Sequence, residues 1–385
     1  MTTRRAEAGP GGPVADFPRT RDHLQHGGGT GWSRRGLTEA TYNGASASGF
    51  DICSSGVTSG WNPGRCRPSV AFSQLVVHQH PFMSTATAKL PSFRLGFAGV
   101  TGDELKGGLG VPVLAGATVD SLFDPTSPLE RVGLFSIFET DGWRLGLASV
   151  STENELEKET CRIYRDLFAA TGSWHLARVW NYVPEINCLG ADGLENYRVF
   201  CRGRSLAFEE KYGSSFKALL PAASAVGSKT SRLTVAFAAY HARPHHVENP
   251  LQVPAYDYPT DYGPRPPSFA RATLVQTGAA PSLFVSGTAA IRGHLTMAPG
   301  DTLRQLEYTL ENLRTISSAC GLKSTLVLPG AEKRMFKVYL RHPSDVPAVA
   351  ARLEQELLLP GDIVSYLHAD ICRVSLNVEI EASLR

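Results

Sequence analysis

Over residues 374–381 the chain alternates strictly between an apolar and a polar side chain. This period of two predicts a β-strand with one apolar face and one polar face. The polar face carries two carboxylates, Glu379 and Glu381, close to the end of the chain. Such carboxylates are ordinary if the face meets water, but a face that closes a pocket can hold a carboxyl group protonated, ready to act as an acid.

Regular patterns begin at about Leu90. Short alternating runs predict strands, and apolar stripes at helical spacing predict helices. We expect strands at 93–100, 132–138, 145–150, 232–239, 283–288 and 336–341, and helices at 153–170, 301–320 and 346–357. A proline-dense stretch at 250–267 has no period and is predicted to be a loop. Strands interspersed with helices in this order indicate an α+β fold.

The chain divides into three parts on this pattern. Residues 1–85 are rich in glycine and arginine and lack any sustained period, so we expect a disordered N-terminal extension. Residues 86–240 and 241–385 are each predicted to form an α+β subdomain. The second subdomain carries the terminal strand and its carboxylates.

Composition limits the class of protein. Of the 385 residues, 42% are hydrophobic and 19% are charged, and the net charge is only +2. These values indicate a globular protein and give no reason to expect nucleic acid or a membrane as a partner. The seven cysteines show no CxxC spacing, and no apolar run approaches the roughly 20 residues of a membrane span. We therefore expect reduced thiols and a cytoplasmic location.

Two arginines are candidates for binding a small acid. Arg204 follows a glycine and Arg265 lies among prolines, where a guanidinium can be aimed. Arginine binds carboxylates bidentately, so two such groups suit a dianion. Tyr197 lies seven residues before Arg204, about two helical turns, and is expected on the same helix face. Surface pairing or helix capping is the alternative for either arginine.

Metal and nucleotide sites are not expected. His241, His245, His246 and Glu248 do not form an HExxH motif, and no carboxylate or cysteine pattern completes them. The glycines at 107–110 are not part of a phosphate-binding loop, and no Gly-x-Ser-x-Gly elbow is present. We predict an enzyme or binding protein without metal or cofactor.

Six ordered motifs together resemble the chorismatase family. They lie at residues 180–187, 195–204, 248–250, 262–271, 286–294 and 378–381. The C-terminal part also resembles the reactive-intermediate deaminase fold, on which chorismatases are built. The resemblance implies two deaminase-like (chorismate-mutase-like) subdomains, whose mixed sheets carry helices on one face.

The resemblance also implies a reaction. Chorismatases cleave the enolpyruvyl ether of chorismate and release pyruvate, which requires a proton on the methylene carbon. Glu379 matches the family's acid, and Glu381, on the same face, is the alternative. Arg204 and Arg265 are then expected to anchor the two substrate carboxylates, with Tyr197 as a hydrogen-bond partner. Lys337, on the polar face of its strand, is a further candidate for stabilising charge.

Two positions distinguish the branches of the family. The hydrolytic branch has alanine at both, whereas the branch that makes 3-hydroxybenzoate has glycine and cysteine. This chain has Gly287 and Cys372 there, and with Thr288 they are expected to shape the pocket around the ring. Cys372 is also grouped with Glu379 as a candidate catalytic residue. The predicted product is 3-hydroxybenzoate, a polyketide starter unit in secondary metabolism. A hydrolytic chorismatase and a non-catalytic small-acid-binding protein remain alternatives, and a monomer or a trimer is expected.

Overall fold

The computed structural model describes residues 93, 95–97, 108–123, 130–153, 155–190, 193–278 and 280–385. All of them belong to one compact unit, Pro63–Arg385. The expected N-terminal extension, residues 1–85, lies outside the described residues. In the described part of the chain, no helix is long and apolar enough to cross a membrane.

One of the two large sheets among the described residues has six strands, in the order β4-β5-β6-β9-β7-β8. They span Glu130–Val132 (β4), Phe135–Thr140 (β5), Trp143–Ser151 (β6), His175–Pro184 (β7), Ala222–Ser228 (β8) and Arg232–Tyr240 (β9). Helices α1 (Leu156–Thr171) and α2 (Asn196–Tyr212) pack on one face of this sheet through a shared apolar core. The short helix η1 (Gly213–Leu219) follows α2.

The other large sheet in the described part has seven strands, in the order β10-β11-β12-β17-β15-β16-β2. They span Val113–Gly116 (β2), His245–Val247 (β10), Ala272–Val275 (β11), Ser282–Ala289 (β12), Arg334–Leu340 (β15), Ile363–His368 (β16) and Val378–Leu384 (β17). Helices α3 (Thr302–Ala319) and α4 (Val346–Glu356) pack on one face of it. We propose that the subdomain boundary lies between residues 240 and 241. Strand β2 precedes this boundary in the chain but pairs within the seven-stranded sheet.

Short elements connect these layers. Two-stranded ribbons are formed by β1 (Leu95–Gly96) with β3 (Val119–Asp120), and by β13 (Ile291–Arg292) with β14 (Leu295–Thr296). Single helical turns are η2 (Ala255–Asp257), η3 (Thr260–Tyr262) and η4 (Pro343–Asp345).

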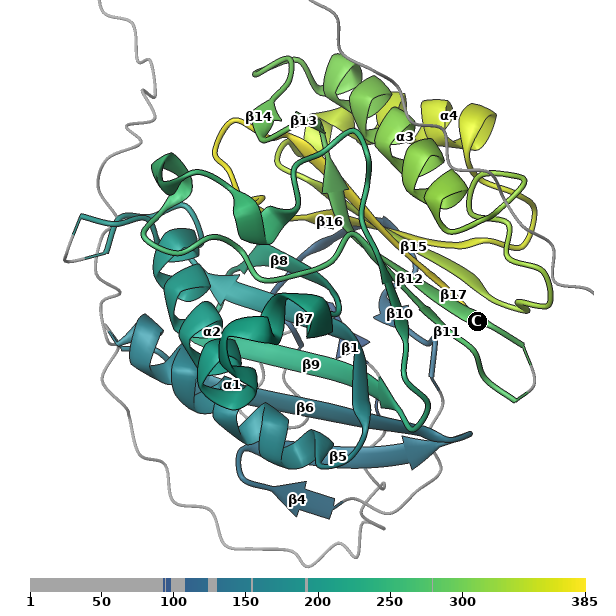
Figure 1. Cartoon of the computed structure of the whole chain (residues 1–385). Coiled ribbons are helices and arrows are strands. Elements are labelled where there is room, and N and C mark those ends of the chain that lie inside the picture. Colours follow the sequence, from purple (N-terminus) through teal and green to yellow (C-terminus); the bar gives the residue numbers. More distant parts are fainter. Residues whose placement is uncertain are drawn as a thin grey trace, which may run out of the picture. The chain divides into compact units, whose positions relative to one another are not determined.

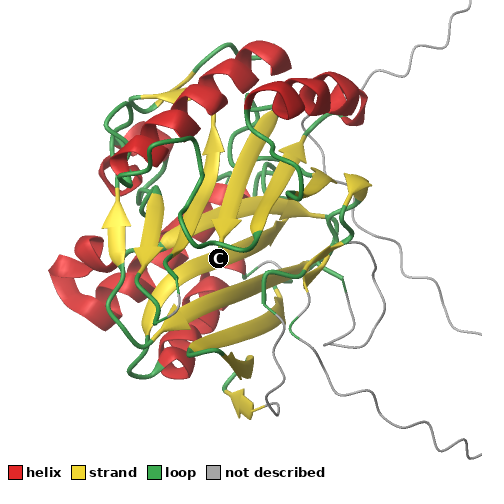
Figure 2. Ribbon diagram, turned by 90° about the vertical axis from the view of Figure 1, so that its right-hand side faces the viewer, coloured by secondary structure: helices red, strands yellow, loops and turns green. Residues whose placement is uncertain are grey.

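The two large sheets face each other, and their helices cover the outer faces (Figures 1 and 2). Large aromatic side chains fill the space between the sheets. The ring of Phe284 on β12 lies 5.5 Å from Trp143 on β6 and 6.3 Å from Trp180 on β7, centroid to centroid. Burial on this scale, with edge-to-face contacts, fixes how the two halves meet. The predicted α+β class, with mixed sheets and helices on one face of each, is confirmed.

The terminal strand begins later than the alternation predicts. Strand β17 runs over Val378–Leu384, and Val374 is 67% exposed in the preceding loop. The backbone N–H of Asn377 donates to the Gln305 side chain of α3 at 2.7 Å, which ties this loop to the helix instead of to the sheet. The alternating segment 374–381 therefore includes a loop, residues 374–377, and only the first part of β17.

Strand β7 was not predicted, because it has almost no polar side. Nine of its ten residues are buried, as is usual for a strand covered on both faces. The expectation of reduced thiols is wrong for Cys188, which is disulfide-bonded, whereas Cys161, Cys201, Cys320 and Cys372 are free. A disulfide depends on tertiary proximity, which sequence spacing alone does not reveal.

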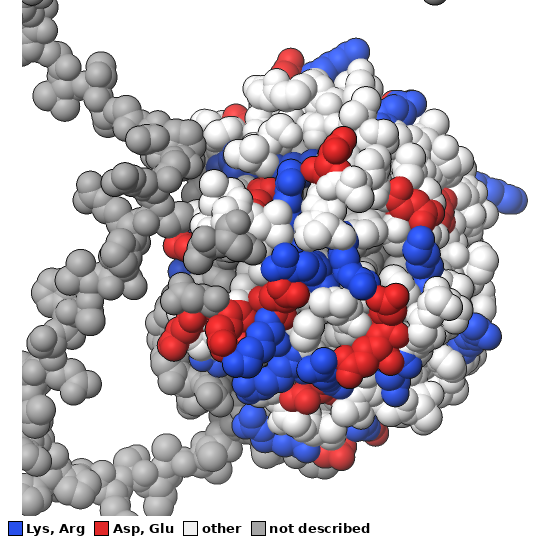
Figure 3. Space-filling model, turned by 60° about the vertical axis from the view of Figure 1, so that its left-hand side comes forward, with Lys and Arg blue, Asp and Glu red and all other residues white. Residues whose placement is uncertain are grey.

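Charges of both signs are interspersed over the face shown in Figure 3. Ion pairs at the surface join α1 and α2: Arg165 pairs with Glu210, and the half-buried Arg202 pairs with Glu157. Pairs of this kind contribute little stability individually.

Candidate active site

A cavity of about 340 Å³ lies between the N-terminal end of α2, the loop that precedes β11, the bulged part of β12 and the loop before β17. Its lining residues are Glu195, Tyr197, Arg198, Tyr258, Tyr262, Pro267, Phe269, Arg271, Gly287, Ala289, Ile291, Thr296, Cys372, Arg373, Val374, Ser375 and Glu379. The size suits a small organic molecule. The predicted site residues Tyr197, Gly287, Cys372 and Glu379 are thus brought together from three distant parts of the chain.

Glu379 lies in the wall of this cavity. Its side chain belongs to the face of β17 that points away from α3 and α4, and the residue is only 3% exposed. Burial, together with the nearby negative charge of Glu381, raises the pKa of Glu379 to about 8. Its carboxyl group is therefore protonated at neutral pH and can donate a proton into the cavity.

A β-bulge in β12 makes room for this carboxyl group. The pairing of β12 with β17 shifts by one residue between Val285 and Thr288, and Gly287 lies in the shifted segment. A Cβ atom at Gly287 would lie 2.0 Å from Oε1 of Glu379 and 2.7 Å from its Cδ. Glycine is therefore needed here for the observed position of the carboxyl group, a close-approach role rather than a need for unusual backbone angles.

Cys372 forms another part of the wall. Burial is the main reason that its pKa lies well above the usual range, and the charge of Glu379 adds to the effect. The sulfur is therefore a neutral thiol, which makes it a small wall residue and a poor nucleophile. Tyr197, at the start of α2, is likewise kept neutral because burial raises the pKa of its hydroxyl group.

Three arginines that the sequence analysis did not select line the cavity: Arg198, Arg271 and Arg373, here called the cavity arginines. Arg271 is only 7% exposed and donates to the hydroxyl oxygen of Tyr258 at 2.8 Å, while its buried Nε has no hydrogen-bond partner among the described residues. The guanidinium carbon of Arg373 lies 4.2 Å from the ring centroid of Tyr262. These guanidinium groups give the cavity a positive wall suited to carboxylates.

Two of the three cavity arginines lie in the sequence motifs, and the third lies beside a predicted pocket residue. Arg198 lies in the motif at 195–204, Arg271 ends the motif at 262–271, and Arg373 follows Cys372 directly. Nothing in the local sequence distinguishes them from Arg204 and Arg265. Only the three-dimensional arrangement shows which side chains reach the cavity.

The two arginines predicted to anchor a substrate lie outside this lining. Arg204 is 2% exposed in the core between α2 and the first sheet, and its guanidinium lies 5.1 Å from the ring centroid of Phe200. The helix turns its side chain towards the core, two turns beyond the cavity. Arg265 forms an ion pair with Glu209 at the surface. These positions lead us to transfer the predicted anchoring role to the cavity arginines.

Thr288 and Lys337 also lie outside the lining. The Thr288 hydroxyl donates to the carbonyl oxygen of Ser286 at 2.8 Å and so supports the bulge. Lys337 is buried with Asp120 and Glu381, at 2.7 Å and 2.8 Å from its Nζ. Burial disfavours the ammonium charge, but these two carboxylates outweigh it and raise the pKa of Lys337 above its usual range.

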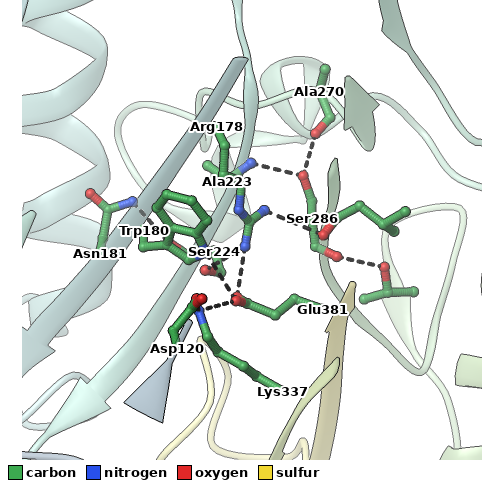
Figure 4. Close-up of polar contacts among 12 residues, drawn as sticks. Asp120, Arg178, Trp180, Asn181, Ala223, Ser224, Ala270, Ser286, Lys337 and Glu381 are labelled. Carbon is green, nitrogen blue, oxygen red and sulfur yellow. Dashed lines mark hydrogen bonds and ion pairs between the residues drawn. The ribbon is translucent and has the colours of Figure 1, made fainter. Parts of the chain in front are cut away.

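Glu381 belongs to a buried ion network with Asp120, Arg178 and Lys337, which joins the two sheets (Figure 4). Oε2 of Glu381 lies 2.7 Å from Nη2 of Arg178, and Oε1 accepts from Trp180 Nε1 at 3.0 Å. Burial alone would raise its pKa, but Lys337 and Arg178 lower the pKa of Glu381 to about 2. Glu381 is thus an ionised carboxylate, which favours Glu379 of the two acids that the sequence left open.

Among the described residues, no group of three or more His, Cys, Asp or Glu side chains is arranged to hold a metal ion. The chemistry that the described side chains offer is proton donation by Glu379 and binding of anions by the cavity arginines. A dianionic substrate with a site to be protonated fits both.

A family model described as "Chorismatase FkbO/Hyg5-like, N-terminal" matches residues 128–239. The chain is 41% identical to a 3-hydroxybenzoate synthase of Streptomyces hygroscopicus over 224 residues, 56% of this chain and 65% of that protein. It is 39% identical to a chorismatase of the same species over 253 residues, 63% of this chain and 72% of that protein. The match thus spans just under two thirds of the first relative.

The structure is similar to a crystal structure of a chorismatase, with a TM-score of 0.62 and 28% sequence identity. This similarity covers 78% of this chain and all of that chain.

Proposed function

Because this chain belongs to the chorismatase family, we propose that it converts chorismate into 3-hydroxybenzoate and pyruvate without a cofactor. The family predicted from the six motifs is confirmed. The observation that carries the proposed reaction is the position of Glu379: a buried carboxyl group, protonated near neutral pH, in the wall of a cavity that also presents three guanidinium groups.

In the proposed reaction, Glu379 gives its proton to the methylene carbon of the enolpyruvyl group. Protonation draws the electrons of the ring carbon–oxygen bond onto the ether oxygen, so that the side chain leaves as pyruvate. The neighbouring ring hydroxyl oxygen displaces it and loses a proton, which returns the Glu379 carboxylate to its acid form. The resulting arene oxide opens to the aromatic 3-hydroxybenzoate, and no water or oxidant is consumed.

The two carboxylates of chorismate require cationic partners inside the cavity. We assign this role to the cavity arginines, of which Arg271 is the most buried; its Nε makes no hydrogen bond with the described residues and lies 3.9 Å from Oε2 of Glu248. Charge-assisted hydrogen bonds of this kind contribute about 1.5–3 kcal/mol each. Tyr197 lines the same cavity as a neutral hydroxyl donor.

The branch of the reaction depends on whether water reaches the ring carbon that pyruvate leaves. Much of the cavity wall is apolar, with Phe269, Ile291 and Ala289 among its residues. Gly287 lets the acid lie close to β12, and Cys372 adds a neutral thiol to the wall. We propose that this arrangement favours the intramolecular displacement over attack by water.

The proposal is tested by incubating the purified protein with chorismate, without added metal or nucleotide, and separating the products by chromatography with mass detection. Pyruvate and 3-hydroxybenzoate in equal amounts are expected. Pyruvate with a dihydroxycyclohexadiene carboxylate would keep the family reaction but contradict the role of Gly287 and Cys372. Chorismate that is bound but not consumed would make the protein a small-acid-binding module.

We propose a cytoplasmic protein, monomeric or trimeric, and sedimentation would decide between these two states.

A further inference from the structure

The buried ion network is placed directly beside the acid. Glu379 and Glu381 are two residues apart on β17, so both side chains leave the same face of the strand, roughly 7 Å apart. Strand β15 runs alongside, with Tyr339 opposite Glu379 and Lys337 opposite Glu381. The network is thus held by the same strands that hold the acid.

Each charge in the network has a partner within it. Glu381 is paired with Arg178 and Lys337, and Lys337 is paired also with Asp120. Two cations and two anions balance, and all four residues are at least nine-tenths buried. The carboxyl group of Glu379 forms no ion pair and no hydrogen bond within the described part of the chain.

The groups that face Glu379 come from every element around it. Glu381 on β17 is the nearest anion, and Arg178 on β7 is the cation whose charge opposes it. Tyr339 on β15 and Cys372 in the loop before β17 are both neutral at physiological pH, because burial raises the pKa of each well above its usual value. Strand β12 contributes only Gly287 and its neighbours. On the cavity side, the other titratable groups of the lining are Glu195, the cavity arginines and the tyrosines Tyr197, Tyr258 and Tyr262.

Resting on the proposed function, we infer that Glu381 is a positioning residue: held as a carboxylate by Arg178 and Lys337, it keeps the proton on Glu379 until substrate accepts it. Two features of the geometry carry this inference. The network is closed, so its cations are occupied and do not pair with Glu379. Glu381, the anion of the network nearest to Glu379, lies on the same face of β17, where its negative charge disfavours ionisation of Glu379.

The decisive experiment removes the negative charge of Glu381 while keeping its shape. In Glu381→Gln, Arg178 and Lys337 lose their carboxylate, and the neighbourhood of Glu379 becomes more positive. A unit charge roughly 7 Å away at an effective dielectric constant of about 20 shifts a pKa by about 1–2 units. We expect the alkaline limb of the kcat–pH profile to move down by this amount, which a merely structural role would not produce.

A measurement that needs no substrate separates this inference from the proposed function. The infrared band of the protonated Glu379 carboxyl group is assigned by its loss in Glu379→Gln and is then titrated in each variant. We expect a lower midpoint in Glu381→Gln and a return towards the wild-type midpoint in Glu381→Gln/Lys337→Met, where a cation is removed as well. An unchanged midpoint in folded Glu381→Gln overturns the inference. A wild-type protein that does not consume chorismate overturns the proposed function instead, and the titration can still be read.

Asp120→Asn provides a second variant in case Glu381→Gln does not fold. It removes an anion at the far end of the network, so a smaller downward shift of the Glu379 midpoint is expected. No shift in this variant would also contradict the inference.

Discussion

The position of Gly287 against the acid leads to the sharpest prediction. Gly287→Ala adds one methyl group at a point 2.0 Å from Oε1 of Glu379. Non-bonded atoms keep about 3 Å or more apart, so the carboxyl oxygen must move by about 1 Å or more. Nothing in the described part of the chain ties that carboxyl group in place, so a rotation of the Glu379 side chain relieves the clash, and the backbone does not have to move.

The expected magnitude follows from this displacement. Misplacing a catalytic group by about 1 Å can cost 10²-fold in rate, or about 2.7 kcal/mol of transition-state stabilisation. We therefore expect kcat to fall by about 10–100-fold while the melting temperature stays close to that of the wild type. The combined Gly287→Ala/Cys372→Ala variant carries alanine at both positions that distinguish the two branches, and it is expected to shift the product towards the dihydrodiol.

The assay is chorismate turnover with separate quantification of pyruvate, 3-hydroxybenzoate and dihydrodiol. Gly278→Ala is the matched control, because a Cβ there would meet no atom within 4 Å and Gly278 is not part of the cavity lining. Glu379→Asp, which shortens the acid by one methylene, should cost less in the Gly287→Ala background than alone, giving a coupling term in a double-mutant cycle. A Gly287→Ala enzyme with wild-type kcat and product ratio would refute the reasoning.

Three further predictions concern the acid, the anchors and the extension. Glu379→Gln should abolish turnover and weaken the dependence of stability on pH. Between pH about 4.5 and 8, the folded wild-type protein holds a proton on Glu379 that the unfolded chain has lost. The free energy of unfolding of the wild type therefore falls by about 1.4 kcal/mol per pH unit across this window. Thermal unfolding at pH 5 and pH 9 checks this, and equal slopes in both proteins would count against a raised pKa. Arg271→Met should raise KM for chorismate by about 10–100-fold. Arg265→Met, which breaks a surface ion pair, should leave KM within twofold. The reverse result would restore Arg265 as the anchor. A chain that begins at Met83 should retain wild-type kcat and KM, and loss of folded protein on this truncation would contradict the expected role of residues 1–85.

Local pattern was sufficient for much of the secondary structure and for the family. The helix at 301–320 follows from its apolar stripe and from Asp301, whose side chain caps α3 by accepting from the Arg304 N–H at 2.9 Å. Glu379 was selected as the candidate acid because it lies on the polar side of an alternating segment and in a family motif. Such features are encoded by neighbours in the chain, since periodicity and capping act over a few residues.

Tertiary structure alone decided which polar groups act together. Glu379 and Glu381 look equivalent in the sequence, but only Glu381 meets Arg178 and Lys337 from other strands, so one carboxyl group is ionised and the other protonated. Likewise, Arg204 and Arg271 each lie in a family motif. Packing buries the Arg204 side chain in the core between α2 and the six-stranded sheet, whereas Arg271 lines the cavity. The charge of a buried side chain depends on partners distant in the chain, because desolvation and ion pairing are set by three-dimensional proximity.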